Sequence, residues 1–449
     1  MRWLFGFGLF FLSLSAAGTL TFQCWQESVW HGSSEEQIYR VQILDDAVIK
    51  PQTLMYRVKT GNQQALVYLP KDSATFALYP ADSLIIRARF RQTDFQYHRS
   101  HLIAATAFVR DWEQIEQSSK QPFNLRFTAL KCRRYLIEHL HKIITDDKEF
   151  SVAAALMFGY RAEMDKDLQQ TFAATGSAHI LSVSGLHFSI LYGILYFIFS
   201  FLGNSQRGMI IRQAIILPLL WFFAFMTGMP PPVVRAASML TLWGIGNSFL
   251  LQPFSLNTVG VAAFFMLLYN PYGLFDVSFQ LSFSAMLAIL LIYPKLFELY
   301  QSRNPVLRYV WGMSCVSVAA QLGTAPLSIY YFHQFPLLFL LTNLFAIPVT
   351  GILLGLISVS LSLYFPFSSQ EWLMIPLNKA LHIFIAVLEW FESIPNGLLV
   401  TEKFSIVDMF CLFFSLISGI MLFFRKRIIY LCLIVIIVLF RFFIMWNIF

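Results

Sequence analysis

Charged side chains are scarce in this chain of 449 residues, and this scarcity excludes an ordinary soluble protein. Asp, Glu, Lys and Arg make up 13% of the residues, against about 25% in soluble domains. Hydrophobic residues make up 57%, and several runs approach or exceed the ~18 apolar residues that a membrane-spanning helix needs. The composition therefore predicts a polytopic α-helical membrane protein.

Cysteine and the common cofactor motifs are also rare or missing. The five cysteines contain no CxxC pair, which argues against a disulfide framework or a metal cluster. The sequence has neither a GxxxxGK[ST] phosphate loop nor an HxHxDH metal motif. We therefore expect no cofactor and no metal site. A bridge between Cys24 and Cys132 is a hypothesis only.

The charges that are present lie unevenly along the chain. Residues 21–177 hold 19 Lys and Arg and 18 Asp and Glu, whereas residues 203–449 hold 12 and 7. This difference indicates a soluble domain that follows a first hydrophobic segment, residues 1–20. We interpret that segment as an uncleaved anchor, although 15–18 also loosely fit a signal cleavage site. Positive loops that orient the helices explain the net charge of +7 better than a nucleic-acid surface does.

Short alternating strands are expected within residues 21–122, at 38–44, 53–60, 64–70 and 83–90. Their spacing of about ten residues predicts a small sandwich or barrel, with an OB-like barrel as the specific candidate. Residues 123–150 then show apolar residues at helical spacing with basic residues between them. This pattern predicts an amphipathic helix at the membrane interface.

The rest of the chain is predicted to form a membrane domain over residues 151–400 and C-terminal transmembrane helices over 401–449. About nine to eleven transmembrane or re-entrant helices fit the hydrophobic runs. We exclude 336–365 and 371–394 from the regular spans because they are interrupted. Basic residues between 295 and 308 and at 425–427 should be cytoplasmic, which places the β domain outside the cytoplasm.

The most unusual segment is 178–202, an uncharged run long enough to cross a bilayer. Its first half carries side chains that are costly in an apolar helix: His179, Ser182, Ser184 and His187, with Gly185 among them. Polar groups at such depth usually line a bundle interior or a water-filled path. The alternative is close packing of helices through small and hydroxyl residues.

Five further polar residues are candidates for the same path, and each has a second interpretation. Arg235 could bind a phosphate bidentately or extend to the membrane interface. Asp276 and Gln280 are one turn apart and could orient Arg235 or a histidine, or Asp276 could only cap the next helix. Asn343 could bond between helices, and Arg161 belongs to a charged run that is more often solvated.

Four segments, in the same order along the chain, carry a resemblance to a known family. Residues 156–191 (LMFGYRAEMDKDLQQTFAATGSAHILSVSGLHFSIL), 228–240, 276–287 and 319–348 are similar to the ComEC family of competence proteins, bacterial inner-membrane channels for imported DNA. The stretch 94–97 also resembles the external OB-like domain of that family. The resemblance implies a non-enzymatic channel that conducts single-stranded DNA into the cytoplasm during natural transformation.

The resemblance also implies partners. A cytosolic DNA translocase ATPase would drive the movement, an extracytoplasmic DNA receptor would supply the DNA, and the chain could form a homo-oligomer. Longer members end in a metallo-β-lactamase-like domain thought to degrade one strand, whereas this sequence stops at Phe449 and has no HxHxDH motif. Nuclease activity is therefore not expected here, and a separately encoded nuclease could supply it.

Two functions from other classes stay open. Ser184 beside a membrane histidine is compatible with an intramembrane serine hydrolase, although no oxyanion-binding group is evident. A small-solute permease built from broken helices would show two related halves. The sequence shows no convincing internal repeat of that kind.

Overall fold

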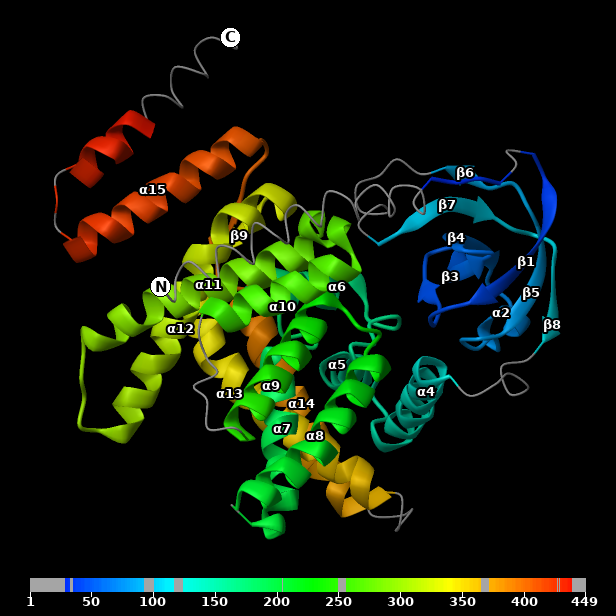
Figure 1. Ribbon diagram of the computed structural model, residues 1–449, viewed down its shortest axis with the longest axis horizontal. Helices are drawn as coiled ribbons and strands as arrows, with labels where there is room; N and C mark the ends of the chain where they lie inside the picture. The colour runs from blue at the N-terminus through cyan, green and yellow to red at the C-terminus, as the bar shows by residue number, and fades with distance from the viewer. Residues whose placement is uncertain are drawn as a thin grey trace. The chain divides into compact units, whose positions relative to one another are not determined.

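The structure is a computed structural model that describes residues 29–32, 35–92, 101–116, 124–203, 205–248, 256–364, 371–425, 427 and 429–437. It divides into two compact units. The first contains residues 1–169, 179–279 and 348–385, and the second contains 170–178, 280–347 and 386–449. Strands dominate up to residue 116 and helices dominate from residue 124 (Figure 1).

An eight-stranded sheet forms the β domain. Its strands are β1 (Gln37–Ile43), β2 (Val48–Ile49), β3 (Thr53–Thr60), β4 (Gln63–Pro70), β5 (Ser83–Ala88), β6 (Arg91–Gln92), β7 (Ile103–Phe108) and β8 (Trp112–Glu116). The strands β1, β3 and β4 form an antiparallel meander. β5 pairs with β1, β7 runs parallel to β4, and β8 returns to β5. This connectivity agrees with the OB-like barrel expected from the sequence.

The core of the β domain follows the alternation of each strand. Val41 and Ile43 of β1, Leu54 and Tyr56 of β3, and their neighbours point inward and are buried. The Tyr56 hydroxyl donates to the Thr75 carbonyl at 2.6 Å, in the short helix α2 (Ser73–Phe76). Burial raises the pKa of the Tyr56 phenol, which therefore stays a donor.

The four strands predicted from the alternation are present, but the short strands β2 and β6 and the longer β7 and β8 were not predicted. β7 reads IAATAF, and alanine has a low preference for strands. Ala105 and Ala107 are nevertheless buried in the core of the β domain, since the inner side of a small barrel has room only for small side chains at some positions. The stretch 94–97 lies outside the described residues.

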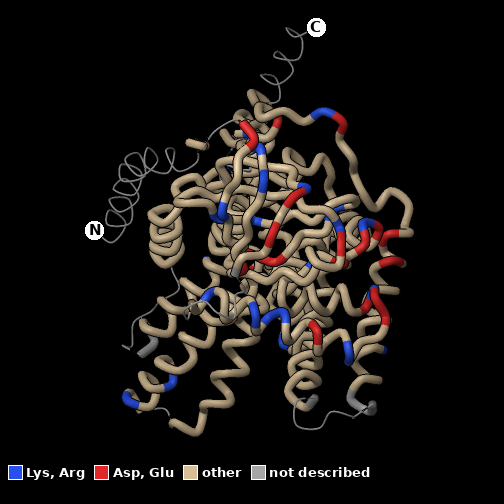
Figure 2. Tube along the Cα trace, turned by 90° about the vertical axis from the view of Figure 1, so that its right-hand side faces the viewer, with Lys and Arg blue, Asp and Glu red and all other residues tan. Residues whose placement is uncertain are grey.

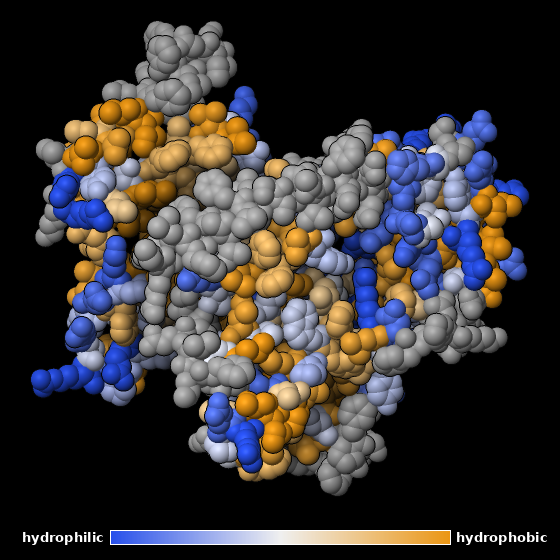
Figure 3. Space-filling model, in the orientation of Figure 1, coloured by the Kyte–Doolittle hydropathy of each residue, from blue (hydrophilic) through white to orange (hydrophobic). Residues whose placement is uncertain are grey.

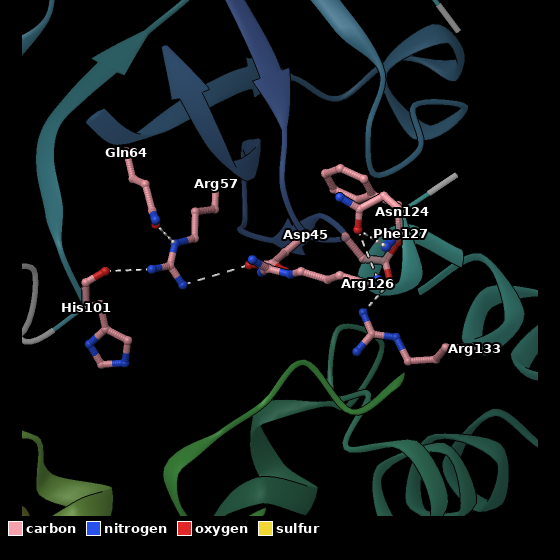
Figure 4. A network of polar contacts seen from close by, with 9 residues as sticks. Asp45, Arg57, Gln64, His101, Asn124, Arg126, Phe127 and Arg133 are labelled. Atoms are coloured by element: carbon pink, nitrogen blue, oxygen red, sulfur yellow. Dashed lines mark hydrogen bonds and ion pairs between the residues drawn. The ribbon is translucent and has the colours of Figure 1, made fainter. Parts of the chain in front are cut away.

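Helix α4 (Leu125–Ile143) lies within residues 123–150, where an amphipathic helix was predicted, and a second helix begins at Asp147. The place of α4 at the membrane interface stays a prediction. The helix α4 begins because the Asn124 side chain accepts hydrogen bonds from the amides of Arg126 and Phe127. Arg126 pairs with Asp45 at 2.7 Å, and Arg133 pairs with Asp46. Figure 4 shows the Asp45 carboxylate between Arg126 and Arg57 of β3. These ion pairs hold α4 against the β domain.

Helices follow from α5 to α10 in the first unit: α5 (Asp147–Phe158), α6 (Lys166–Ala174), α7 (Gly185–Ile198) with the 3-10 turn η2 (Phe199–Leu202), α8 (Gln206–Met226), α9 (Pro231–Ser248), α10 (Leu256–Tyr269) and the 3-10 turn η3 (Pro271–Phe275). The helix α6 runs across the boundary of the units. α7, α8 and α9 share a core that includes Val183, Phe188, Ile216 and Ala237. On the face seen in Figure 3, apolar residues gather over parts of the helices, and long helical stretches carry no charge (Figure 2).

The remaining helices are α11 (Val277–Glu298), α12 (Pro305–Phe332), α13 (Phe339–Tyr364), α14 (Glu371–Glu392) and α15 (Ile406–Arg425). Within the second unit, Ala288 and Ile292 of α11 pack on Ala319 of α12 and Ile420 of α15. The short strands β9 (Gln334–Pro336) and β10 (Leu398–Val400) pair antiparallel in the same unit.

Six helices among the described residues are long and apolar enough to span a membrane, and α10 is a shorter apolar helix. They agree with a polytopic membrane protein. The exclusion of 336–365 and 371–394 was wrong, because α13 and α14 are continuous and both qualify as spans. Pro348 and Pro376 lie inside them, and a proline can bend a helix without ending it. The anchor expected at 1–20 and residue Cys24 lie outside the described residues.

Gly323 sets the distance between α11 and α12. An added Cβ would lie 2.5 Å from the Ala288 Cβ and 2.7 Å from the Ser284 carbonyl oxygen. We predict that Gly323→Ala destabilises the protein by about 1–3 kcal/mol through overpacking. Gly260→Ala on α10 is the matched control, since its Cβ would meet nothing within 4 Å. Thermal unfolding in detergent measures both, and equal midpoints would contradict the packing argument.

Candidate functional site

Helix α7 begins at Gly185, so it covers only part of the apolar run 178–202. Residues 178–183 are not helical, so His179 and Ser182 do not belong to the helix that carries His187. Ser184 is the N-cap, with extended backbone angles of φ −116° and ψ 177°. The uncharged run 178–202 is therefore helical only from Gly185 onward, because serine favours the cap position over the helix interior.

Ser184 and His187 close a capping box at this end of α7. The Ser184 amide donates to His187 Nδ1 at 3.1 Å, and the Leu186 amide donates to Ser184 Oγ at 3.2 Å. Ser184 Oγ also lies 2.9 Å from His187 Nδ1. Since Nδ1 accepts, the ring hydrogen of His187 belongs on Nε2. The box satisfies amides that the first turn of a helix leaves without partners.

His187 Nε2 is buried and has no hydrogen-bond partner among the described residues. The whole residue is 4% exposed. A buried donor without a partner is costly, so the atom is available to a group outside the described residues. His179 is exposed, and it lies close enough to His187 to interact electrostatically.

Arg161 supports the non-helical segment from the loop after α5. Its Nε donates to the Leu181 carbonyl at 3.1 Å, one residue before the half-buried Ser182. Arg161 is otherwise exposed, as expected for part of a charged run. The structure therefore brings Arg161 to the segment 178–184, although 20 residues separate it from Leu181.

Arg235 lies beside the start of α7, on the second turn of α9. A Cβ added to Gly185 would lie 3.9 Å from the Cβ of Ala236, the residue after Arg235. Val183 and Val233 join the same core. Arg235 is 9% exposed, so it is not extended into solvent. Two helices thus place their N-terminal turns, with partial positive charge, near the same segment.

Asp276 caps a helix and also meets a histidine. Its Oδ1 accepts from the Phe279 amide at 3.1 Å and caps α11, and its Oδ2 lies 3.3 Å from His101 Nε2 of the β domain. The capping interpretation thus agrees with the structure, and the histidine that Asp276 contacts is His101. The sequence pattern did not reveal His101, because this pairing joins residues 175 positions apart.

Gln280 and Asn343 belong to the second unit. Gln280 Oε1 accepts from the Tyr331 hydroxyl at 2.9 Å, which links α11 to α12. Asn343 is 7% exposed, and its Oδ1 accepts no hydrogen bond from the described residues. Over the part of the chain that the structure describes, no group of three or more His, Cys, Asp or Glu residues could hold a metal ion.

Comparison with known proteins shows a family match over the part of the chain that holds this site. A family model described as "Competence protein" matches residues 156–426, a range that contains the start of α7 and Arg235. This chain belongs to the competence protein family. The match confirms the resemblance seen in residues 156–191, and the capped start of α7 lies within that family signature.

Relatives in the competence family include a ComE operon protein 3 from Bacillus subtilis (strain 168), which is 26% identical over 65% of this chain and 35% of its own length. A Recombination protein 2 from Haemophilus influenzae is 27% identical over 44% of this chain and 26% of its own length. An uncharacterized protein from Aquifex aeolicus is 28% identical over 68% of this chain and 67% of its own length. The chain thus spans about a third of the first relative. No solved structure matches this chain significantly.

The capping box within the competence signature predicts a stability effect at Ser184. Ser184→Ala removes the acceptor of the Leu186 amide and should destabilise the protein by about 1 kcal/mol, whereas Ser184→Thr should retain most of the cap. Ser189→Ala is the control, because Ser189 Oγ donates only to the Gly185 carbonyl within the helix. Thermal unfolding measures the difference, and unchanged stability of Ser184→Ala would contradict the capping role.

Proposed function

We propose that this protein takes part in DNA uptake and conducts single-stranded DNA across the bacterial cytoplasmic membrane. Membership of the competence family supports a role in DNA uptake. The observation that carries the more specific proposal is the buried Nε2–H of His187, which no described residue accepts, at the capped start of α7. The residue after Arg235, Ala236 of α9, lies next to this start.

A DNA strand carries one negative charge per nucleotide, so it cannot cross hydrocarbon without donors and positive potential along its way. The N-terminal turns of α7 and α9 supply partial positive charge, and Arg235 supplies a full one. The buried N–H at His187 Nε2 makes no hydrogen bond to a described residue, and a phosphate oxygen could accept one from it. Each contact lies within the first unit.

The partners and the orientation belong to the same proposal. A cytosolic DNA translocase ATPase would move the strand, and an extracytoplasmic receptor would deliver it to a β domain on the outer side of the membrane. Two groups of basic residues support that orientation through the preference of positive loops for the cytoplasm: Lys295, Arg303 and Arg308 around the connection from α11 to α12, and residues 425–427 at the end of α15. The proposal also includes a separately encoded nuclease that degrades one DNA strand. It further includes assembly of this chain into a homo-oligomer.

The channel proposal predicts loss of DNA uptake in two variants that keep the fold. His187→Asn retains an amide oxygen that can replace Nδ1 in the capping box but has no counterpart of Nε2. Arg235→Gln removes one buried charge. Because a hydrogen bond to a charged group contributes about 1.5–3 kcal/mol, we expect each variant to reduce transformation about tenfold or more. Complementation of a deletion strain measures the effect at equal membrane expression.

The controls make matched changes elsewhere. His139→Asn alters a half-buried histidine of α4, and Arg207→Gln removes an exposed charge at the start of α8. Both control variants should transform normally. Normal transformation by His187→Asn and Arg235→Gln together would remove the support for a DNA path at this site.

A second candidate, an intramembrane serine hydrolase, is favoured by one observation. Ser184 Oγ lies 2.9 Å from His187 Nδ1, within the range of a nucleophile and its base. The Ser184 hydroxyl is, however, also the acceptor of the Leu186 amide, and no described residue bonds to Nε2 to orient the ring. Labelling with a fluorophosphonate tests this alternative. We expect no reaction at Ser184, and specific labelling that Ser184→Ala abolishes would support the hydrolase.

A further inference from the structure

The C-terminal ends of α11 and α15 bring two cations together in the second unit. Lys295 Nζ of α11 lies 5.2 Å from the centroid of the Phe424 ring of α15, and Arg425 is the next residue. The two helices also meet about one turn earlier, where Ile292 of α11 and Ile420 of α15 belong to the same hydrophobic cluster. Residues far apart in sequence thus form one positively charged end.

The start of α12 adds two more cations to this end. Trp311 Nε1 donates to the Phe297 carbonyl at 3.2 Å, and its ring centroid lies 5.8 Å from that of Tyr300. These contacts hold the first turns of α12 against the last turn of α11. Arg308 lies one turn before Trp311, and Arg303 precedes the helix. Four cations therefore lie around the same end of these helices.

These four cations are not neutralised by the residues that the structure describes. All four are exposed, and none of them forms an ion pair within the described part of the chain. Between 277 and 336 the sequence has one acidic residue, Glu298. The helix dipoles attract Lys295 and Arg425 at the ends of α11 and α15, but the dipole of α12 repels Arg308 near its start. A negative charge from elsewhere would therefore stabilise this end.

Exposed apolar side chains begin directly beside the cations. Leu291 lies one turn before Lys295 and is 54% exposed, and Phe423 lies two residues before Arg425 and is 59% exposed. The apolar spans of α11 and α15 end at this level, at Glu298 and Arg425. In a bilayer, acyl chains surround such spans and the headgroups lie at their ends. A ligand for this place thus needs an anionic head and an apolar body.

We propose that the C-terminal ends of α11 and α15 bind an anionic phospholipid, with its phosphate between Lys295 and Arg425 and an acyl chain along Leu291 and Phe423. Basic sites between transmembrane helices suit such headgroups. The exposed apolar residues favour a lipid over a nucleic acid or an acidic protein, which would meet only the charges. This inference does not depend on the DNA path, because it needs only the membrane class and the contact between α11 and α15.

Titration of the full-length protein in detergent with phosphatidylglycerol tests the proposal, with native mass spectrometry to count the bound lipid. Phosphatidylcholine with the same acyl chains is the zwitterionic comparison and should bind more weakly. One basic residue near anionic lipid contributes about 1 kcal/mol, so Lys295→Gln and Arg425→Gln should each raise the Kd for phosphatidylglycerol about fivefold. Lys295→Arg keeps the charge and should bind about as the unaltered protein does.

Lys403→Gln is the matched control for the loss of one positive charge. Lys403 is exposed, belongs to the same unit and precedes α15, so it lies at the other end of this helix from Arg425. Its substitution should leave the Kd unchanged. Thermal unfolding gives a second readout, because a ligand that binds only the folded protein raises the midpoint. Phosphatidylglycerol should raise the midpoint of Lys403→Gln more than that of Lys295→Gln.

Three outcomes would overturn the lipid site. The first is equal affinity of the unaltered protein for phosphatidylglycerol and phosphatidylcholine, and the second is an equal Kd for Lys295→Gln and Lys403→Gln. The third is equal protection by glycerol 3-phosphate, which has the phosphate without acyl chains and would indicate a site for soluble phosphates.

A fluorescent oligothymidylate separates a lipid site from a nucleic-acid site. Lys295→Gln and Arg425→Gln should bind it as the unaltered protein does. If both variants weaken oligothymidylate binding and leave phosphatidylglycerol binding unchanged, these cations bind nucleic acid and the lipid assignment is wrong.

Discussion

A chain in an apolar bundle must satisfy its backbone hydrogen bonds within the protein, and the segment before α7 shows how this constraint shapes the molecule. Where residues 178–183 leave the helix, Ser184 and His187 cap the first turn of α7, and Arg161 binds the Leu181 carbonyl. The chain can therefore be irregular here without losing its partners. The same capping contact uses His187 Nδ1 and leaves the buried Nε2 for another group.

Ion pairs connect the β domain to the helices of the first unit. Asp45 and Asp46 bind arginines of β3 and α4, and His101 lies against Asp276 at the start of α11. A buried pair such as Arg133 with Asp46 contributes more to the geometry than to the net stability, since its desolvation offsets much of the attraction. These contacts give the β domain a defined place against α4 and the start of α11 within the first unit.

Much of the fold could be predicted because its signals are local. Long apolar runs predict spans, alternation predicted four strands, and the basic amphipathic pattern predicted α4. The failures also have local causes: the alanines of β7 hide a buried strand, and the prolines of α13 and α14 suggested breaks that packing absorbs. The candidate site was predicted less completely. His187 and Arg235 could be selected because polar and charged side chains are rare in apolar segments. The roles of Asp276 and Gln280 depend on which residues lie next to them in the fold.

Composition and the ordered motifs of residues 156–348 determined the membrane class and pointed to the family without any coordinates, because both depend only on which residues occur and in what order. Tertiary structure decided which polar groups have partners. Asp276 caps a helix and meets His101, Arg161 reaches a carbonyl 20 residues away, and Tyr68 stacks on Phe108. Such contacts join residues far apart in sequence, and only the paths of the helices and strands bring them within the few ångströms at which hydrogen bonds and ring contacts act.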